Sequence, residues 1–309
     1  MENAQVSVFL AYASKHGHTL IDRRIYLPQS WTSDAQRREQ AGIPATVEFA
    51  TRSQLADDMI TAARQALTPA RWVTADEAYG NNSMLRARLR ALRLGYVLAI
   101  SRDHLVPISG GKARRRADHL AAGLPAWAWT RRSAGHGSKG PRLYDWAWLT
   151  DVGTDADPGA GGQHSLLIRR NYTTGELAFY RCWTPEPAGL AQLVHIAGTR
   201  WTVEEGFQTA KGQVGLDQHQ VRQWQSWHRH ATLALAALAI LAICAANERP
   251  EPNTIRRSAN EIRRLINILI QHPAHDTAHR LHWSNWRTQH RQRATRAHYT
   301  RRLTLEFQP

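Results

Sequence analysis

The order of apolar and polar positions in the first part of the chain predicts alternating strands and helices. Two apolar runs, over residues 5–12 and 19–27, flank a short polar turn, which indicates a β-hairpin. The segment SDAQRREQAG, residues 33–42, predicts a first helix, for which Ser33 or Asp34 is a suitable N-cap. Apolar residues at helical spacing over 53–67 predict a second helix. The pattern therefore places the start of this chain inside a sheet.

The segment between residues 71 and 101 has the pattern of a strand, a helix and a second strand. Apolar runs at 71–76 and 96–101 predict the strands, and NSMLRARLRALRLG, residues 82–95, predicts a helix closed by Gly95. Strands joined by a helix in this order pair in parallel, so we expect an α/β sheet.

The pattern changes after this unit. Residues 101–125 are basic and loop-like, and residues 126–183 contain three β-rich runs, LYDWAWLTDV, HSLLIRRNY and LAFYRCW. These runs indicate a β-rich insertion or subdomain. Helical pattern returns near residue 188 and leads to the apolar stretch at 231–246, which is short for a membrane span and is better explained as a buried core helix.

Composition narrows the class of partner. The chain has 309 residues with 40 Lys and Arg against 25 Asp and Glu, a net charge of +15. Such an excess suits a polyanion, because each Lys or Arg that contacts a phosphate releases condensed counterions. The Arg-rich tail at 255–303 has no evident core, and its Trp283 and Trp286 are able to stack on nucleic-acid bases. A soluble basic enzyme without a nucleic-acid partner explains the same charge and stays open.

Cysteine usage excludes two further classes. Only Cys182 and Cys244 occur, and neither has a second cysteine at the CxxC spacing. A disulfide scaffold and a cysteine-based zinc site are therefore excluded, and a reducing cytoplasm is favoured.

The first candidate for chemistry is Asp76, in RWVTADEAYG. A strand that only packs ends on neutral turn residues, whereas a strand that ends on Asp can present a metal ligand or a general base. Glu77 stands beside it, but adjacent strand residues point to opposite faces, so only one of the two serves a given site. A capping or turn role explains Asp76 equally well.

The second candidate is a helical face in the segment from Gly198 to Trp224. Arg200, Glu204 and Lys211 are separated by four and seven residues, which places all three on one side of a helix. Such a face is commonly a solvated salt-bridge stripe. The functional alternative makes Glu204 a metal ligand while Arg200 and Lys211 hold phosphate.

Several longer stretches, taken in order, extend these observations over nearly the whole chain. They are QVSVFLAYAS, LIDRRIYLPQSW, AGIP, WVTADEAYG, YVLAIS, GSKGPRLYDWAW, AGTRWTVEEGFQTAKGQVGLDQHQVRQWQSWHRHATLALAALA and the Arg-rich tail. The chain resembles bacterial insertion-sequence transposases of the IS701 type, a branch of the DDE superfamily. The resemblance implies an α/β fold with a ribonuclease H-like core, in which three carboxylates bind two divalent ions, Mg²⁺ or Mn²⁺.

The resemblance also assigns residues. Asp76 matches the second carboxylate, at the end of the fourth strand, and Glu204 matches the third, on the helix after a β-rich insertion. Arg200, Glu204 and Lys211 fit the spacing R-x3-E-x6-K of a related signature, whose Tyr falls on Ala197. The implied reaction is cleavage of a DNA strand followed by transfer of its 3′-end. The expected DNA-binding residues are Arg200, Lys211, Lys112, Arg114, Arg115 and Arg116.

The match leaves one catalytic carboxylate without a counterpart. In this family the first Asp lies on the first strand, directly before the hairpin, and residues 1–4 contain no Asp. Asp22 lies on the third strand, at a position that is not catalytic in the family, so we give it little weight as a substitute. We therefore expect an N-terminally truncated chain. Its fold should show a gap between strands 5–12 and 71–76, or direct pairing of these two strands.

The sequence hypothesis is an inactive or impaired copy of an IS701-type transposase, either a remnant or a gene with a misassigned start. One alternative is an active protein whose missing strand comes from another polypeptide or from an upstream start. A second is a non-catalytic DNA-binding protein, such as a repressor of the intact element. DNA is the expected partner, with a homo-oligomer also allowed, no membrane, and a bacterial cytoplasmic, nucleoid-associated location.

The expected organisation has four parts. They are the first part of the core at 1–100, without its first strand; a basic, β-rich insertion at 101–187; the C-terminal helices of the core at 188–247; and an Arg-rich tail at 248–309.

Overall fold

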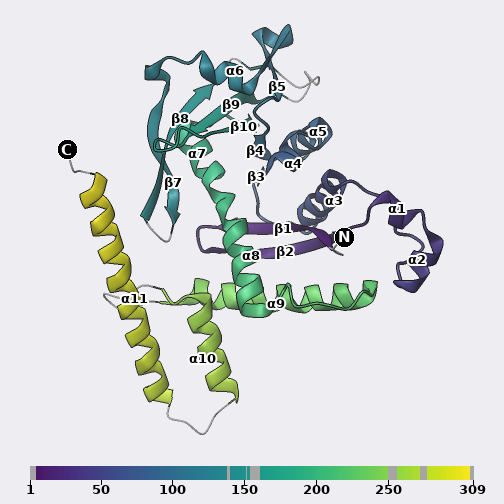
Figure 1. The fold of residues 1–309 in the computed structure, drawn as a ribbon, viewed down its shortest axis with the longest axis vertical. Helices are drawn as coiled ribbons and strands as arrows, with labels where there is room; N and C mark the ends of the chain where they lie inside the picture. The colour runs from purple at the N-terminus through teal and green to yellow at the C-terminus, as the bar shows by residue number, and fades with distance from the viewer. Residues whose placement is uncertain are drawn as a thin grey trace.

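The computed structural model describes residues 5–137, 140–150, 152–153, 161–249, 256–271 and 277–306. These residues form a mixed α/β fold with a curled six-stranded sheet and two separate two-stranded sheets (Figure 1). Parts of the expected Arg-rich tail, residues 250–255, 272–276 and 307–309, lie outside the described residues.

The chain begins with the predicted hairpin. Strands β1 (Val6–Ser14) and β2 (Gly17–Tyr26) pair antiparallel, with a bulge after Leu10. Helices α1 (Gln29–Thr32), α2 (Ala35–Gln40) and α3 (Arg52–Gln65) follow. The Asp34 carboxylate accepts the backbone N–H of Arg37 at 3.0 Å, which makes Asp34 the N-cap of α2. The hairpin and both predicted helices are confirmed.

The strand–helix–strand unit is also confirmed. Strand β3 (Trp72–Ala75) pairs in parallel with β4 (Gly95–Ile100), and α4 (Glu77–Gly80) and α5 (Ser83–Ala91) lie between them in sequence. The prediction that Gly95 closes the helix is wrong, because α5 ends at Ala91 and Gly95 begins β4. A side chain there would collide with Trp72, whose ring lies 2.8 Å from the position of a Cβ at Gly95.

The β-rich segment extends the sheet that β3 and β4 begin. Strands β7 (Thr130–Gly137), β8 (Gly140–Leu149), β9 (Gln163–Arg170) and β10 (Leu177–Thr184) complete the order β3-β4-β10-β9-β8-β7, with β10 antiparallel to β4. Three of these strands are the predicted runs. The fourth, β7, was not predicted because its sequence, TRRSAGHG, is mostly polar. The division of the chain into domains stays a prediction.

The basic segment over 101–125 is not the expected loop. Residues Leu105–Ile108 (β5) and Ala113–Arg116 (β6) form an antiparallel hairpin, followed by α6 (Ala117–Ala122). Val106 and Ala117 are fully buried in a cluster with strands β8, β9 and β10. This anchoring explains why a stretch with few apolar residues has regular structure.

Helices α7 (Leu190–Thr199), α8 (Trp201–Val214) and α9 (Trp224–Asn247) complete the core. Helix α9 contacts β2 and α8, but only one of its faces is buried. Leu233, Ile240 and Ile243 are 66%, 55% and 59% exposed, so the expectation of a buried core helix is wrong for that face. By length and composition α9 is the one helix in the described residues that is able to cross a membrane, which is weak evidence for a membrane protein.

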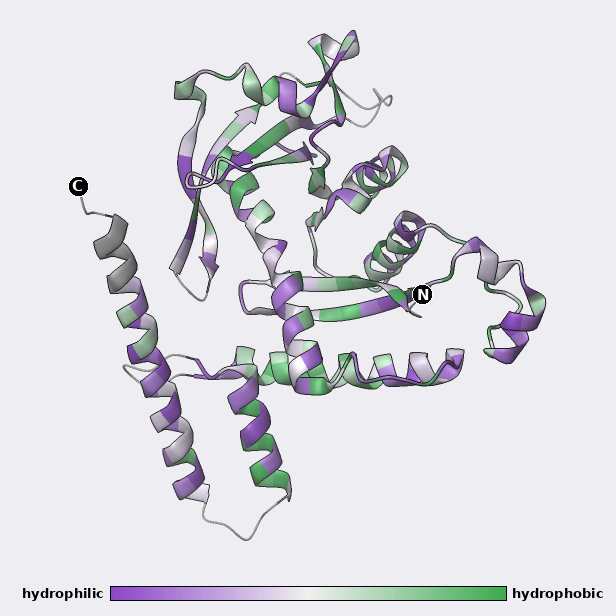
Figure 2. Ribbon diagram, viewed as in Figure 1, coloured by the Kyte–Doolittle hydropathy of each residue, from purple (hydrophilic) through white to green (hydrophobic). Residues whose placement is uncertain are grey.

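The Arg-rich tail folds into two helices, α10 (Ala259–Gln271) and α11 (Thr277–Glu306). Figure 2 shows hydrophobic and hydrophilic positions alternating along α10, which contacts α8, α9 and α11. The buried Glu261 carboxylate of α10 accepts a hydrogen bond from Arg287 of α11 at 2.8 Å. The tail therefore has packing of its own, contrary to the expectation.

The expected gap is present. Strands β1 and β3 belong to different sheets, so the hairpin does not pair with the six-stranded sheet. The two nevertheless share one apolar cluster, in which Leu10 of β1 and Val73 and Ala75 of β3 pack around Leu98 and Ile60. The core is thus continuous across a break in strand pairing.

Candidate active site and basic surfaces

Asp76 follows β3 directly and begins α4. Its carboxylate accepts the backbone N–H of Ala78 at 3.0 Å and so caps the helix. The position of α4 is fixed by Gly80, where a Cβ would lie 1.8 Å from the carbonyl oxygen of Ala99 on β4. Burial raises the pKa of the neighbouring Tyr79, and the Asp76 charge raises it further. The structure thus shows the predicted strand-tip position together with the capping role.

Glu204 lies in the first turn of α8, on the exposed side of the helix. Its side chain is 49% exposed and pairs with Arg200, four residues earlier, at 3.4 Å. This is the solvated ion pair that the spacing allowed, and such pairs contribute about 0.3–0.5 kcal/mol. Lys211 lies two turns further on, exposed, beside a cavity of about 820 Å³ that Phe9 and Trp224 also line.

The described residues do not assemble a metal centre. No group of three or more His, Cys, Asp or Glu lies close enough together in the described ranges to hold a metal ion. Carboxylate oxygen is the donor that Mg²⁺ prefers, so Asp76 and Glu204 have suitable chemistry. One carboxylate caps a helix and the other pairs with Arg200, however, and two carboxylates alone do not make a two-ion site.

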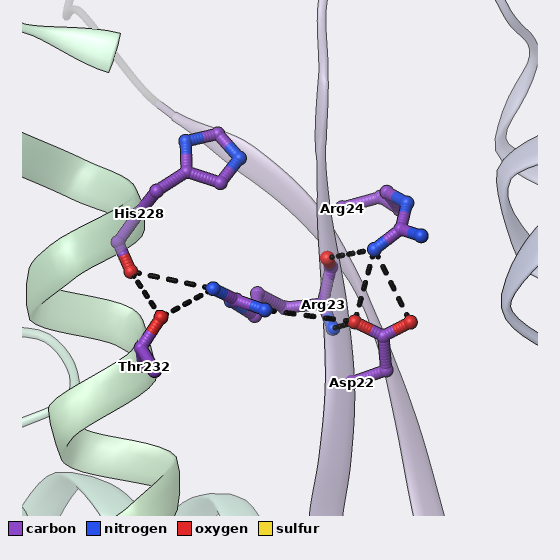
Figure 3. Close-up of polar contacts among 5 residues, drawn as sticks. All are labelled: Asp22, Arg23, Arg24, His228 and Thr232. Carbon is purple, nitrogen blue, oxygen red and sulfur yellow. Dashed lines mark hydrogen bonds and ion pairs between the residues drawn. The ribbon is translucent and has the colours of Figure 1, made fainter. Parts of the chain in front are cut away.

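Asp22 has a structural role on β2. Its carboxylate accepts hydrogen bonds from the Arg23 backbone at 2.7 Å and from the Arg24 guanidinium at 2.9 Å. Figure 3 shows Arg23 extending from this strand to α9, where it donates to the hydroxyl of Thr232 and to the backbone oxygen of His228. Asp22 therefore helps to hold Arg23 and Arg24 on the hairpin, and its unsuitability as a catalytic substitute stays a prediction.

The basic run at Lys112–Arg116 lies on the edge of the β5–β6 hairpin. Lys112, Arg114 and Arg115 are exposed, and none forms an ion pair with another described residue. Arg116 differs, because it pairs with Asp118 at 2.7 Å, and this hydrogen bond raises the pKa of Arg116. Three of the four predicted DNA-binding positions in this run are thus available to a partner.

Helix α11 presents the tryptophans of the tail to solvent. Trp283 and Trp286 are 44% and 49% exposed, with ring centroids 5.6 Å apart. The Trp286 ring also stacks on His290, and Arg293 and Arg296 are exposed further along the helix. The aromatic side chains expected to stack on bases are therefore accessible.

A further basic surface was not predicted from the sequence. Arg131 of β7 and Arg170 of β9 flank Asp145 of β8 in a cross-strand row, with contacts of 3.0 and 3.3 Å. Arg170 also lies over the Trp129 ring and Arg131 over the Tyr172 ring. These residues are far apart in sequence, and only strand pairing brings them together. No local sequence pattern marks this row in advance.

Residues 1–127 match a protein family described as DDE superfamily endonuclease. No curated protein matches the chain. The match supports a DDE transposase-like family and suggests a transposase-like nuclease function acting on DNA. It includes β1 to β4 and Asp76 but ends before Glu204, whose assignment rests on the resemblance alone. Nucleases of this superfamily generally use divalent metal ions and are typically soluble and cytoplasmic.

Proposed function

We propose that this chain is a DNA-binding, transposase-like protein of the DDE type, from the IS701 branch, in which Asp76 and Glu204 are two of the metal-binding carboxylates. The observation that carries the proposal is the family match over residues 1–127, which contains β3 and the Asp76 that directly follows it. The net charge of +15 and the exposed basic positions on the β5–β6 hairpin and α11 support DNA as the partner.

The two carboxylates have different local tasks in this proposal. Asp76 is held at the tip of β3 by its hydrogen bond to Ala78, so its position is fixed by the sheet. Glu204 pairs with Arg200 at 3.4 Å, which places the carboxylate beside a cation able to contact phosphate. A divalent ion, Mg²⁺ or Mn²⁺, would supply activation of a water or a 3′-hydroxyl. A pair of such ions would need more oxygen ligands than these two carboxylates supply.

A second candidate is a DNA-binding protein without catalytic activity. The observation that favours it is that the described residues contain no group of three metal ligands, whereas basic side chains on the β5–β6 hairpin and on α11 are exposed. In this case Asp76 is only a helix cap and Glu204 only the partner of Arg200.

The substitution Glu204→Gln separates the two candidates. It removes one negative charge from an exposed side chain, so folding and DNA affinity should change little. Nicking of supercoiled plasmid in Mg²⁺ or Mn²⁺, and affinity for labelled duplex DNA, are measured on both proteins. Nicking by the wild type that is lost in the variant, at equal affinity, supports the enzyme. Equal DNA binding with no nicking by either protein supports the binder, and absence of DNA binding contradicts both.

The DNA surface is tested by a matched pair of variants on one strand. Arg114→Ala with Arg115→Ala removes two unpaired cations, whereas Arg116→Ala removes a cation that Asp118 already pairs. Fluorescence anisotropy of a labelled duplex at several salt concentrations gives the affinity and its salt slope. We expect the double variant to lower the slope by about 2, since each phosphate contact contributes roughly 0.9, and Arg116→Ala to change it much less. Equal effects of the two changes would contradict this surface.

A further inference from the structure

Helix α9 has two apolar faces, and only one of them packs against the protein. The buried face contacts β2 and α8 and consists of Trp227, Ala231, Ala234, Leu235, Leu238 and Leu241. On the other face Leu233, Ile240 and Ile243 are each more than half exposed. Residues 230–247 contain no Asp, Glu, Lys or Arg. An exposed apolar face of this length is typical of an interaction surface.

The exposed positions have the spacing of a helix that pairs with another helix. Six exposed residues of α9 follow one another at intervals of four, three, four, three and four: Arg229, Leu233, Ala236, Ile240, Ile243 and Asn247. These intervals are those of the a and d positions of a coiled coil. We call these six residues the α9 seam.

The α9 seam is symmetric about the level of Leu238, at the middle of the helix. If a second copy of α9 runs antiparallel and crosses at this level, Leu233 lies opposite Ile243 of the second copy, and Ala236 lies opposite Ile240. Each contact then occurs twice, which is the arrangement that a two-fold dimer requires. A small side chain also meets a large one, which favours close packing. The seam is therefore complementary to itself.

Charge selects the antiparallel orientation over the parallel one. Arg229 is the one charged residue of the seam. In a parallel pair its guanidinium would face Arg229 of the second copy, and the two like charges would repel each other. In an antiparallel pair it lies opposite Asn247, in the last turn of the second helix. The C-terminal end of a helix carries partial negative charge and attracts a cation.

We propose that the α9 seam binds the α9 seam of a second copy of this chain, as an antiparallel two-fold dimer. Helix α9 has 24 residues and is about 36 Å long at roughly 1.5 Å per residue. A strip of this length and of about 10 Å width on each copy is smaller than the roughly 1,200–2,000 Å² of stable interfaces. The dimer should therefore be weak, with a dissociation constant of about 1 µM or more.

A matched pair of isoleucine substitutions locates the interface. Ile240 in the seam and Ile270 on α10 are 55% and 73% exposed, so replacing either with Lys should leave the fold intact, which circular dichroism checks. Sedimentation velocity of the full chain, freed of nucleic acid, is measured between about 1 and about 100 µM. We expect the wild type and Ile270→Lys to shift from monomer to dimer over this range. Ile240→Lys should dimerise at least tenfold more weakly.

Cysteine cross-linking tests the orientation and keeps the seam apolar. Cys244 is exposed and is first replaced with Ser, whereas Cys182 is buried. A tagged copy then carries Leu233→Cys and an untagged copy carries Ile243→Cys. Under mild oxidation the mixture should form a disulfide between the two copies. Neither variant should do so alone, because two cysteines at the same position lie about 15 Å apart in the antiparallel pair, beyond the reach of a disulfide.

Four results would overturn the proposal. They are a wild type that stays monomeric over the whole range, equal weakening of the dimer by the two lysine substitutions, disulfides in each single variant but not in the mixture, and flotation of a monomer with phosphatidylcholine vesicles. The last result would assign the seam to a membrane surface. None of these measurements uses DNA or a metal ion, so their outcome is independent of the proposed function.

Discussion

Strands β4 and β1 have similar apolar sequences but different surroundings. Strand β4, GYVLAI, lies between β3 and β10, and its Tyr96, Val97 and Leu98 are 0% exposed. Strand β1, VSVFLAYAS, contacts α3 and α8 but, among the described residues, pairs with a strand on one edge only. Apolar sequence therefore predicts that the two faces of a strand are covered, and it does not predict what lies along its edges.

The largest expected effect comes from truncating a leucine in each strand. Leu98 of β4 is fully buried, and Leu10 of β1 is partly buried in the same apolar cluster, beside a cavity of about 590 Å³ between β1 and β3. Leu98→Ala should lower the free energy of unfolding by about 2–5 kcal/mol. Leu10→Ala should cost less than half as much, because part of its surroundings is already empty. Urea unfolding gives both values, and equal costs would remove the distinction between the two strands.

A smaller effect is expected where the hairpin meets α9. Arg23 donates hydrogen bonds to the Thr232 hydroxyl and to the His228 backbone oxygen, and these two hydrogen bonds connect the hairpin to α9 (Figure 3). Arg23→Ala should lower the free energy of unfolding by about 1.5–3 kcal/mol, the range for charged hydrogen bonds. Amide exchange should become faster in β1 and β2 but not in β4. Arg24→Ala is the control, since the hydrogen bonds of Arg24 to described residues stay within β2, and faster exchange in β4 would contradict the expectation.

Lowering the pH should reduce the stability of the hairpin and of the six-stranded sheet in different pH ranges. Burial lowers the pKa of His18, in β2, below its ordinary 6.5, with a partial opposing effect of Glu205. The unfolded chain then binds the proton more readily, so this contribution to stability falls as the pH falls below 6.5. In β8, burial raises the pKa of Asp145, but hydrogen bonds and charges from Arg131 and Arg170 outweigh burial and lower it below 3.8 overall. Its contribution is present above pH 3.8 and is lost as the pH falls through the lowered value.

Two substitutions test this separation. His18→Gln should remove the pH dependence of unfolding that begins near 6.5 and leave the more acidic part unchanged. Asp145→Asn should do the reverse. Unfolding free energies measured across the pH range decide, and a single transition that neither substitution shifts would count against both assignments.

The smallest effect is expected at the exposed ion pair of α8. Glu204→Gln should change the free energy of unfolding by less than about 0.5 kcal/mol, because the Glu204 side chain is 49% exposed and its one ion pair among the described residues is with Arg200. A larger change in thermal or urea unfolding would mean that Glu204 supports the fold. A loss of nicking in Glu204→Gln could then not be attributed to the loss of a catalytic carboxylate.

The hairpin and the parallel pair β3–β4 were predictable because each depends on local periodicity. The joining of β10 to β4 was not, since antiparallel pairing of residues about eighty positions apart leaves no local sequence pattern. Asp76 was placed at its strand tip from sequence, and capping, the alternative considered, is the contact that the structure shows. The row of Arg131, Asp145 and Arg170 was not predictable, because it arises only from the strand register. Whether Asp76 and Glu204 act together stays a prediction.

The comparison between β4 and β1 is tested most directly by native-state amide hydrogen exchange on the free protein. Strand β4 has a hydrogen-bonded neighbour on both edges, so all its amides should be protected. In β1 and β3 only the amides that face β2 and β4 should be protected, and the alternate ones, which face the cavity between β1 and β3, should exchange much faster. Uniform protection along β1 and β3, equal to that of β4, would contradict the account, because both edges of these two strands would then be hydrogen-bonded.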